Sequence, residues 1–325
     1  MIENGILNIN KPAGMTSHDV VAIVRRVTGI RRVGHTGTLD PMAQGVLPVC
    51  IGTAARITEY LDMDFKTYRC TMLLGKITDT QDIWGETIEE RPVTDISSSD
   101  IERALAGFKG YIDQTPPMYS AVKVRGKKLY EYARAGEEVK VKSRRIYIKN
   151  LEAEEINMDK NTVRFTVTCS KGTYVRTLCH DAGNILGCGA CLASLERTAS
   201  GRFTIEDSVP MDRIREMTTE EIEGLLLPTD FPLTHFGEAV VNRETGRQFA
   251  DGHHLPLNRC VVTREPEYGD VEPEISIRPE YRKAYNIYQK TSSGKIFLGV
   301  AFYSDKYRKL VADKVFSRGD SNESV

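Results

Sequence analysis

Alternating apolar and polar residues occur in short runs along the first 230 residues and predict β-strands. The alternation is clearest over residues 68–74 and 163–169, and apolar runs at 6–9 and 46–51 predict further, more deeply buried strands. In an alternating strand one face of the sheet is expected to be buried and the other exposed. The strands show no regular strand–helix–strand period. The pattern therefore predicts an α+β domain around a mixed, largely antiparallel sheet.

Apolar residues at helical spacing predict two well-delimited helices between these strands. Thr16 and Asp19 form a capping-box pair in front of the first helix, which Gly29 is expected to end. The second helix is expected over residues 174–186, where Gly187 supplies the stop signal. Both helices carry an apolar face that needs a sheet or another helix to cover it.

Two further helices are expected in the same region with less regular patterns. The first covers residues 54–61. The second covers 101–108, with Ser99 and Glu102 three residues apart as its capping box.

The pattern changes after a Pro- and Gly-containing stretch at residues 230–237. Beyond it, short strands and one helix near residues 244–249 predict a small β-rich module, with strands at 285–289, 296–302 and 310–316. We expect a first domain over 1–235 and the β-rich module over 236–316. The polar residues 317–325 are expected to form a disordered tail.

Composition and charge exclude several classes of protein. The chain has 325 residues, 40 % hydrophobic and 27 % charged, with a formal net charge of −1. These are ordinary values for a globular protein, and they exclude an acidic disordered chain and a uniformly basic one. No apolar run reaches the roughly 18–20 residues of a membrane span. The N-terminus lacks the basic-then-apolar order of a signal peptide, so we expect a cytoplasmic protein.

Seven cysteines are scattered through apolar stretches, which does not indicate a disulfide framework. Cys188 and Cys191 have the CxxC spacing of some metal and redox sites. Structural zinc normally takes four nitrogen or sulfur ligands, and no second CxxC or HxxxH motif completes such a set. We interpret Cys188 and Cys191 as small side chains packed in the interior, and we expect no metal.

Positive charge is concentrated in residues 122–149. This segment holds ten Lys or Arg residues and three acidic residues, a net charge of +7, with tyrosines in and around it. Basic residues interleaved with aromatic ones are typical of surfaces that bind nucleic acid. A solvated surface loop would show the same charge pattern, so charge alone leaves both interpretations open.

The most unusual stretch is the loop over residues 32–48, rich in Gly, Thr and Pro. It lacks the Gly-Lys-Ser/Thr of a phosphate-binding loop and is not a GxGxxG motif. It holds one carboxylate, Asp40, directly before Pro41. A carboxylate on a rigid loop can act as a nucleophile or base if an arginine such as Arg176 pairs with it. A simple Asp-Pro turn is the alternative, and the residues alone leave both open.

The sequence resembles the bacterial tRNA pseudouridine synthase B family. GHTGTLDP at residues 34–41, with GVLP at 45–48, is similar to that family's catalytic motif. Similar blocks follow in family order over the first 200 residues: KPAGMTS at 11–17, KTYR at 66–69, TDTQD at 78–82, PMYSA at 117–121, GKKLYEYA at 126–133 and SKGTYVRT at 170–177. The C-terminal module is similar to the family's PUA-like barrel, although residues 263–282 diverge.

The resemblance implies a pseudouridine synthase fold and a cofactor-free isomerisation of uridine 55 in the T-stem-loop of tRNA. The N1–C1′ bond would break, and the uracil would turn and rejoin the sugar through C5. The family's catalytic aspartate corresponds to Asp40. Whether it adds to the base, traps C1′ or removes a C2′ proton stays open.

The resemblance also assigns roles to five neighbours of Asp40. Tyr68 would stack on the target base and relay the C5 proton, and Arg176 would pair with the aspartate. Tyr174 and Leu195 would line the uracil pocket. His35 would occupy the space left by the extruded nucleotide. Lys11 is expected to support the loop, and Asp82 to position it without being part of the catalytic set.

The basic segment matches the family's thumb loop, which closes over RNA. Lys127, Lys128, Arg144 and Arg145 are the expected contacts to the RNA backbone, giving affinity and salt dependence but little base choice. We expect tRNA as the partner, no membrane, and a monomer that needs no protein partner.

Two other functions are considered as alternatives. The first is an RNA-binding or tRNA-folding protein with incidental catalysis, against which the presence of Asp40, Tyr68 and Arg176 argues. The second is a guide-RNA-dependent synthase subunit. The long basic segment and the KTYR block look more like the stand-alone bacterial form.

Overall fold

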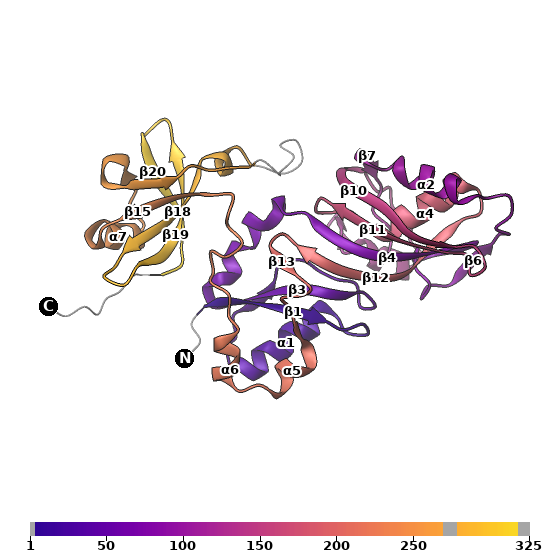
Figure 1. Ribbon diagram of the computed structural model, residues 1–325, viewed down its shortest axis with the longest axis horizontal. Coiled ribbons are helices and arrows are strands. Elements are labelled where there is room, and N and C mark those ends of the chain that lie inside the picture. Colours follow the sequence, from indigo (N-terminus) through magenta and orange to yellow (C-terminus); the bar gives the residue numbers. More distant parts are fainter. Residues whose placement is uncertain (1–3, 269–277, 318–325) are drawn as a thin grey trace.

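Two β-sheets organise the residues that the computed structural model describes, which are 4–268 and 278–317 (Figure 1). The first sheet is mixed but largely antiparallel, which confirms the α+β class predicted from the sequence. Its strands are β1 (Gly5–Lys11), β2 (Val33–His35), β3 (Gln44–Ile51), β4 (Lys66–Leu74), β7 (Gly110–Gln114), β10 (Arg144–Asn157), β11 (Thr162–Cys169), β12 (Ala190–Ser200), β13 (Phe203–Thr204) and β14 (Val209–Pro210).

The first sheet has a narrow parallel junction near its centre. Its strand order is β14-β1-β3-β12-β4-β11-β10-β7. β12 pairs with β4 along its whole length but meets β3 at only two register positions, where Glu196 faces Gln44 and Arg197 faces Gly45. This junction brings the loop that precedes β3 against the middle of β12.

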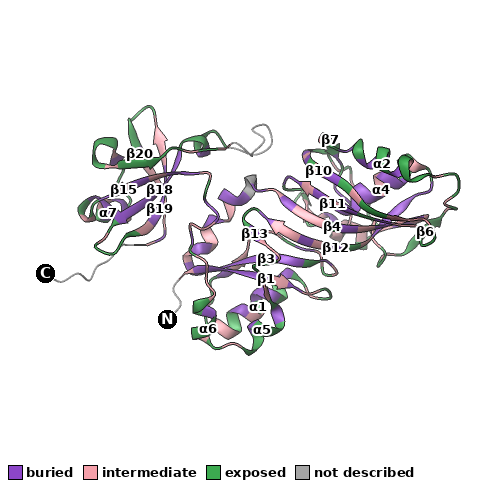
Figure 2. Ribbon diagram, in the orientation of Figure 1, coloured by how far each residue is buried: buried purple, intermediate pink, exposed green. Residues whose placement is uncertain are grey.

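Helices cover the apolar face of the first sheet at both of its ends. α2 and α4 pack near β10 and β12, and α5 packs beside α1 near β1 (Figure 1). The helices are α1 (Ser17–Thr28), α2 (Ser98–Ala106), α3 (Leu129–Arg134), α4 (Val175–Leu186), α5 (Met211–Glu216), α6 (Thr219–Gly224) and α7 (Arg243–Ala250). Figure 2 shows the buried residues concentrated along the strands, with exposed residues on the outer helices.

The ends of α1 and α4 lie where the sequence signals predict them. The Thr16 hydroxyl accepts from the backbone of Asp19, and the Asp19 carboxylate accepts from the backbone of Thr16. Gly29 and Gly187 follow the two helices in left-handed conformation, with φ of +71° and +80°. Glycine adopts this conformation without steric cost.

Both of the less regular helices are present, and the bounds of the second differ from those expected. Residues 54–61 belong to η1 (Gly52–Met63), a 3₁₀ helix. Ala54, Ile57 and Tyr60 are buried at every third position, which fits three residues per turn. The capping box of α2 is Ser97 with Asp100 rather than Ser99 with Glu102, so this helix runs from Ser98 to Ala106 instead of over 101–108.

The C-terminal module is a second, curled sheet that forms an open half-barrel (Figure 1). Its strand order is β16-β20-β19-β18-β15-β17, and it agrees with the expected PUA-like type. Its strands are β15 (Gly237–Val241), β16 (Leu255–Pro256), β17 (Val261–Arg264), β18 (Ala284–Lys290), β19 (Lys295–Ser304) and β20 (Lys309–Val315), with 3₁₀ turns η2 (Leu257–Arg259) and η3 (Pro279–Lys283).

A shared apolar core joins the two sheets through η1. Ile57 and Tyr60 of η1 belong to one buried cluster with Tyr281 of the C-terminal module. The Arg56 guanidinium donates to the carbonyl oxygen of Val315 at 2.8 Å. The C-terminal module is therefore fixed against the first domain by buried contacts.

Two hairpins stand apart from the sheets: β5 (Lys76–Thr78) with β6 (Thr87–Glu90), and β8 (Lys123–Val124) with β9 (Lys127–Lys128). The expected tail at 317–325 lies outside the described residues except for Ser317, and so does much of the divergent stretch at 263–282. Among the described residues, no helix is long and apolar enough to cross a membrane.

Gly45 at the β3–β12 junction offers a test of this architecture. Its φ is +104°, and a Cβ atom placed there would lie 2.2 Å from the carbonyl oxygen of Arg197. We predict that Gly45→Ala lowers the free energy of unfolding by roughly 2–5 kcal/mol, from backbone strain and overpacking together. Urea unfolding followed by circular dichroism measures this change.

Gly224→Ala is the matched control. Gly224 has no left-handed φ, and a Cβ atom there meets nothing within 4 Å. This variant should keep or slightly raise stability, since alanine is the better helix former. Equal stability of the two variants would contradict the tight junction.

Candidate active site

A cleft of about 800 Å³ opens where the loop before β3 meets β4, β12 and the start of α4. Its wall holds more positive than negative side chains. The carboxylates are Asp40 and Asp82, and the basic groups are Lys66, Arg134, Lys171, Arg176 and Arg197. The chain as a whole carries a net charge of −1, so this cleft is a local site of positive charge suited to an anionic ligand.

Asp40 lies on a loop that buried groups hold in place. Lys11 is fully buried, and its Nζ donates to the carbonyl oxygens of Met15 and Pro41 at 2.6 and 3.2 Å. The buried Ser17 hydroxyl accepts from the backbone nitrogen of Leu39 at 2.9 Å. The residues on both sides of Asp40 are thereby fixed, while its own side chain remains 47 % exposed to the cleft.

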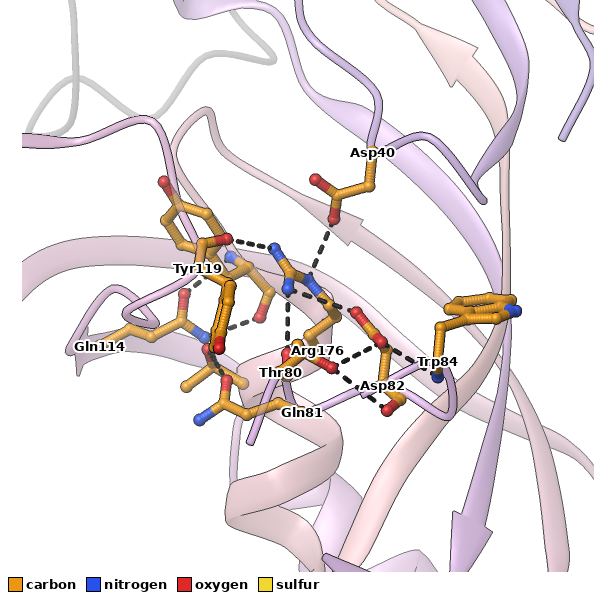
Figure 3. Close-up of polar contacts among 10 residues, drawn as sticks. Asp40, Thr80, Gln81, Asp82, Trp84, Gln114, Tyr119 and Arg176 are labelled. Atoms are coloured by element: carbon orange, nitrogen blue, oxygen red, sulfur yellow. Dashed lines mark hydrogen bonds and ion pairs between the residues drawn. The ribbon is translucent and has the colours of Figure 1, made fainter. Parts of the chain in front are cut away.

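Arg176 binds Asp40 and two other segments at once (Figure 3). Its Nε lies 3.0 Å from the Asp40 carboxylate, and its side chain is only 6 % exposed. One terminal nitrogen donates to the carbonyl oxygen of Thr80 at 2.9 Å, and the other to that of Tyr119 at 3.0 Å. The structure therefore places the two residues together, as the sequence leads us to expect.

Asp82 is a second carboxylate partner of Arg176. Its Oδ2 lies 3.3 Å from the guanidinium, and its Oδ1 accepts from the Thr80 hydroxyl and from the backbone nitrogen of Trp84. Sequence reasoning left Asp82 out of the catalytic set and assigned it a positioning role. These contacts fit that assignment.

Tyr68 and Arg197 face each other across β4 and β12. Tyr68 is half-buried in the cleft wall, and burial raises the pKa of its hydroxyl, an effect that the nearby Arg197 guanidinium partly opposes. Arg197 is 2 % exposed and donates to the carbonyl oxygens of Val46 and Gly37 at 2.7 and 3.1 Å.

Sequence reasoning missed the role of Arg197. The family resemblance places Leu195 at the pocket, and alternation along a strand would put Arg197 on the same side, two residues later. This alternation could have identified Arg197 as a residue of the cleft wall.

Tyr174 and Leu195 lie in the wall of the same cleft. Tyr174 is the residue before α4, and its backbone is fixed by Gln114, whose side chain accepts from the Tyr174 nitrogen at 2.7 Å and donates to its carbonyl oxygen at 3.0 Å. Leu195 is 9 % exposed in β12. Together with Tyr68, these side chains give the cleft the aromatic and apolar surface that a planar ring needs.

His35 lies apart from the other expected residues. Among the described residues, the cleft wall includes His18 but not His35. The two imidazole rings are in edge contact, with centroids 5.5 Å apart. Burial lowers the pKa of His35 and favours its neutral form.

The basic segment reaches the cleft through residues other than the four expected ones. Tyr130 and Arg134 of α3 line the wall. Lys127 forms an ion pair with Glu137 at 3.0 Å. Lys128 lies over the ring of Tyr130, with its Nζ 5.3 Å from the centroid.

The other two expected RNA contacts, Arg144 and Arg145, are exposed at the start of β10. The Arg145 guanidinium lies over the ring of Tyr111, 4.8 Å from its centroid. This contact supports the side chain without neutralising its charge.

The CxxC cysteines are part of the packed interior. Cys188 and Cys191 are both buried free thiols. Burial raises the pKa of Cys191 to about 11 and that of Cys188 in the same direction, so both stay protonated at neutral pH. Among the described residues, no group of three or more His, Cys, Asp or Glu side chains is placed to hold a metal ion.

Comparison with known families matches most of the chain. Residues 25–175 match the model described as TruB family pseudouridylate synthase (N terminal domain), and residues 176–234 match the tRNA pseudouridylate synthase B C-terminal domain. A tRNA pseudouridine synthase B of Alkaliphilus oremlandii is 46 % identical over 80 % of this chain and 85 % of its own length. That of Clostridium perfringens is 40 % identical over 94 % of this chain and 97 % of its own.

Solved structures share the fold at lower identity. A chain of the archaeal box H/ACA sRNP Nop10–Cbf5 complex superposes with a TM-score of 0.70 at 24 % identity, covering 98 % of this chain and 88 % of that one. A chain of an H/ACA RNP bound to a substrate RNA containing 2′-deoxyuridine gives 0.69 at 21 % identity, covering 97 % and 86 %.

Lys11 predicts a pH-dependent difference in stability. Burial lowers its pKa from 10.5 to about 8 in the folded protein. Between these two values the unfolded chain binds more protons than the folded one, so the contribution of Lys11 to stability rises with pH. Relative to Lys11→Met, the wild type should gain roughly 1–2 kcal/mol between pH 8 and 9.5.

Urea unfolding of both proteins at each pH measures the Lys11 effect. The Met variant lacks the titrating group, so pH effects from all other residues cancel in the difference. A difference that stays constant with pH would show that Lys11 titrates normally.

Proposed function

Since the chain belongs to the TruB family of pseudouridylate synthases, we propose that it isomerises uridine 55 in the T-stem-loop of tRNA and that Asp40 is its catalytic residue. Membership makes it a tRNA pseudouridine synthase, an isomerase that converts uridine to pseudouridine. The N1–C1′ bond breaks, a C5–C1′ bond forms, C5 loses a proton and N1 gains one. Atoms balance within the nucleotide, so the proposed reaction uses no cofactor.

The observation that carries the proposal is the Asp40–Arg176 pair at 3.0 Å in a cleft with a basic wall. Addition to the base, capture of C1′ and removal of a C2′ proton all require a charged carboxylate next to the nucleoside. Arg176 supplies the positive partner and fixes the direction of the Asp40 carboxylate. Asp82 acts on Asp40 only through Arg176, so we assign it a positioning role.

The target base must leave its stack before Asp40 can reach the sugar, which costs a few kcal/mol. Tyr68 would offset part of this cost by stacking on the uracil, while Tyr174 and Leu195 close the pocket around it. The raised pKa keeps the Tyr68 hydroxyl protonated. A neutral phenol can relay the C5 proton by accepting one proton as it gives up its own. His35, behind His18, would fill space left by the extruded nucleotide.

Residues 122–149 act as a thumb that contacts RNA phosphates in this proposal. Arg144 and Arg145 are exposed at the start of β10, whereas Lys127 must first leave Glu137. Binding through phosphates gives affinity rather than base choice. Base choice then comes from the shape of the T-loop.

We assign residues 1–235 to catalysis and 236–316 to RNA binding, in a cytoplasmic monomer that acts on tRNA without guide RNA or protein partner. The relatives named tRNA pseudouridine synthase B are 40–46 % identical to this chain, whereas the H/ACA chains are 21–24 % identical. This difference favours the stand-alone enzyme over the guide-dependent subunit.

Asp40→Asn should abolish pseudouridine formation and leave tRNA affinity within a few-fold. The change keeps the size of the side chain but removes the negative charge that the chemistry needs. Pseudouridine mapping on an unmodified tRNA transcript measures both the product and its position. The exposed Asp113→Asn on β7 is the control and should keep full activity. If the Asp40→Asn variant kept a tenth of wild-type turnover, the assignment of Asp40 as the catalytic residue would be wrong.

Neutralising Arg144 and Arg145 to Ala should weaken tRNA binding and make its salt dependence shallower. The slope of log affinity against log salt should fall by roughly 0.7–0.9 for each phosphate that the variant no longer neutralises. The single-turnover rate at saturating RNA should change little, because Asp40 and Arg176 stay in place.

The exposed Arg103 and Lys109, neither of which lines the cleft, give a control with the same change in net charge. Their replacement by Ala should leave the salt slope unchanged. An unchanged slope with a collapsed rate in the Arg144/Arg145 variant would mean that these residues order the active site instead.

A further inference from the structure

A tight turn at the rim of the cleft presents two large apolar side chains to solvent. The backbone nitrogen of Gly85 donates to the carbonyl oxygen of Asp82 at 3.3 Å, which closes a turn with Ile83 and Trp84 at its tip. Ile83 is 36 % exposed and Trp84 45 %. Trp84 is the only tryptophan of the chain. Exposed apolar groups at the rim of a site often mark a contact surface.

Backbone hydrogen bonds hold the turn in place, so the backbone that carries the indole has a fixed position. The backbone nitrogen of Ile83 donates to the carbonyl oxygen of Leu192 in β12 at 2.9 Å, and Leu192 donates to Gln81 at 3.0 Å. At Gly85, a Cβ atom would lie 2.2 Å from the Thr80 hydroxyl, so the chain packs closely there. A rigid aromatic side chain can bind a ring with little loss of conformational entropy.

Trp84 separates the catalytic cleft from a second hollow of about 310 Å³. Met42 and Leu195 also line both. In Figure 3 the indole lies on the far side of Asp82 from Arg176, away from the Asp40 contact. The second hollow therefore adjoins the cleft that holds Asp40, with Trp84 in the wall between them.

The second hollow also carries groups that suit a nucleotide. Arg69 and Arg164 line it together with Glu196 and the polar side chains of Gln44 and Ser194. Both guanidinium groups are about half exposed and have acidic partners, Glu196 at 3.5 Å from Arg69 and Glu155 at 3.0 Å from Arg164. Exposed ion pairs of this kind are weak, so Arg69 can exchange its carboxylate for a phosphate.

We propose that Trp84 is a stacking platform for a second unpaired base of the tRNA substrate, which the hollow beside it receives while the target uridine occupies the catalytic cleft. The inference rests on the proposed function. Stacking needs only the face of a base. This site therefore increases the affinity for RNA and fixes the position of the RNA relative to the cleft, with little sequence preference. The backbone nitrogen of Trp84 donates to the Asp82 carboxylate, which links the turn that carries the platform to the carboxylate that holds Arg176.

The single tryptophan makes a direct test possible. In the inactive Asp40→Asn background, titration with an unmodified T-arm hairpin should quench the fluorescence of Trp84. Trp84→Ala should weaken binding of the hairpin by roughly 5- to 150-fold, the range expected when one base no longer stacks. Trp84→Phe should retain most of the affinity, because a smaller ring still stacks.

Ile88→Ala is the matched control. Ile88 is 66 % exposed on β6 of the same hairpin but lines neither hollow. Its replacement should leave both affinity and quenching unchanged. Circular dichroism and melting curves of the variants check that each is folded.

Hairpins in which each T-loop base is removed in turn identify the stacked base. At one position other than the target, removal of the base should abolish the quenching of Trp84. The same removal should weaken binding when Trp84 is present and leave binding unchanged in the Trp84→Ala variant. Quenching that survives every base removal, or equal affinity of the Ala variant, would overturn the proposal. Pseudouridine formation by the wild type on the same hairpin tests the proposed function separately, because stacking is measured without turnover.

Discussion

The guanidinium of Arg176 is the group on which the geometry of the site depends. It binds the loop that carries Asp40, the segment 80–82 and the backbone of Tyr119 at the base of the thumb. A buried charge costs several kcal/mol unless hydrogen bonds and opposite charges surround it. Here two carboxylates and two carbonyl oxygens satisfy it. The three segments can therefore reach their lowest energy only when assembled around this side chain, which ties catalytic geometry to fold stability.

Local patterns were enough to predict β1, β3, β4 and β11, the last three strands of the C-terminal module, and the ends of α1 and α4. They did not predict the long strands β10 and β12. Alternation marks which side chains of β4 and β11 are buried, and the pairs Thr16–Asp19 and Leu186–Gly187 mark α1 and α4. The residues alone raised Arg176 as one partner for Asp40, and the motif resemblance assigned the pairing. Asp40 lies on the loop before β3 and Arg176 in the first turn of α4, and the two side chains are 3.0 Å apart. Periodicity alone could not have supplied this pair, because it reports burial and not which distant segments meet.

The missed features are those that long-range packing decides. Alternation places Arg197 on the same face as Leu195, but its burial follows from the two-position pairing of β3 with β12, which no local pattern predicts. Two capping boxes were possible at the start of α2, and the structure uses the earlier one. The motif resemblance pointed to His35 of β2, whereas it is His18 of α1 that lines the cleft.

The contacts of Arg197 have a consequence for the order of assembly during synthesis. Arg197 follows Val46, whose carbonyl it binds, by 151 residues. At about 5–20 residues per second, a ribosome needs roughly 8–30 s to add that length of chain. Throughout that interval the nascent Asp40 loop lacks Arg197, for most of it the loop also lacks Arg176, and β3 has no neighbour on its β12 side. The site is thus among the last parts of the domain to form, and this high contact order makes an early stop in translation yield an inactive chain with an open sheet edge.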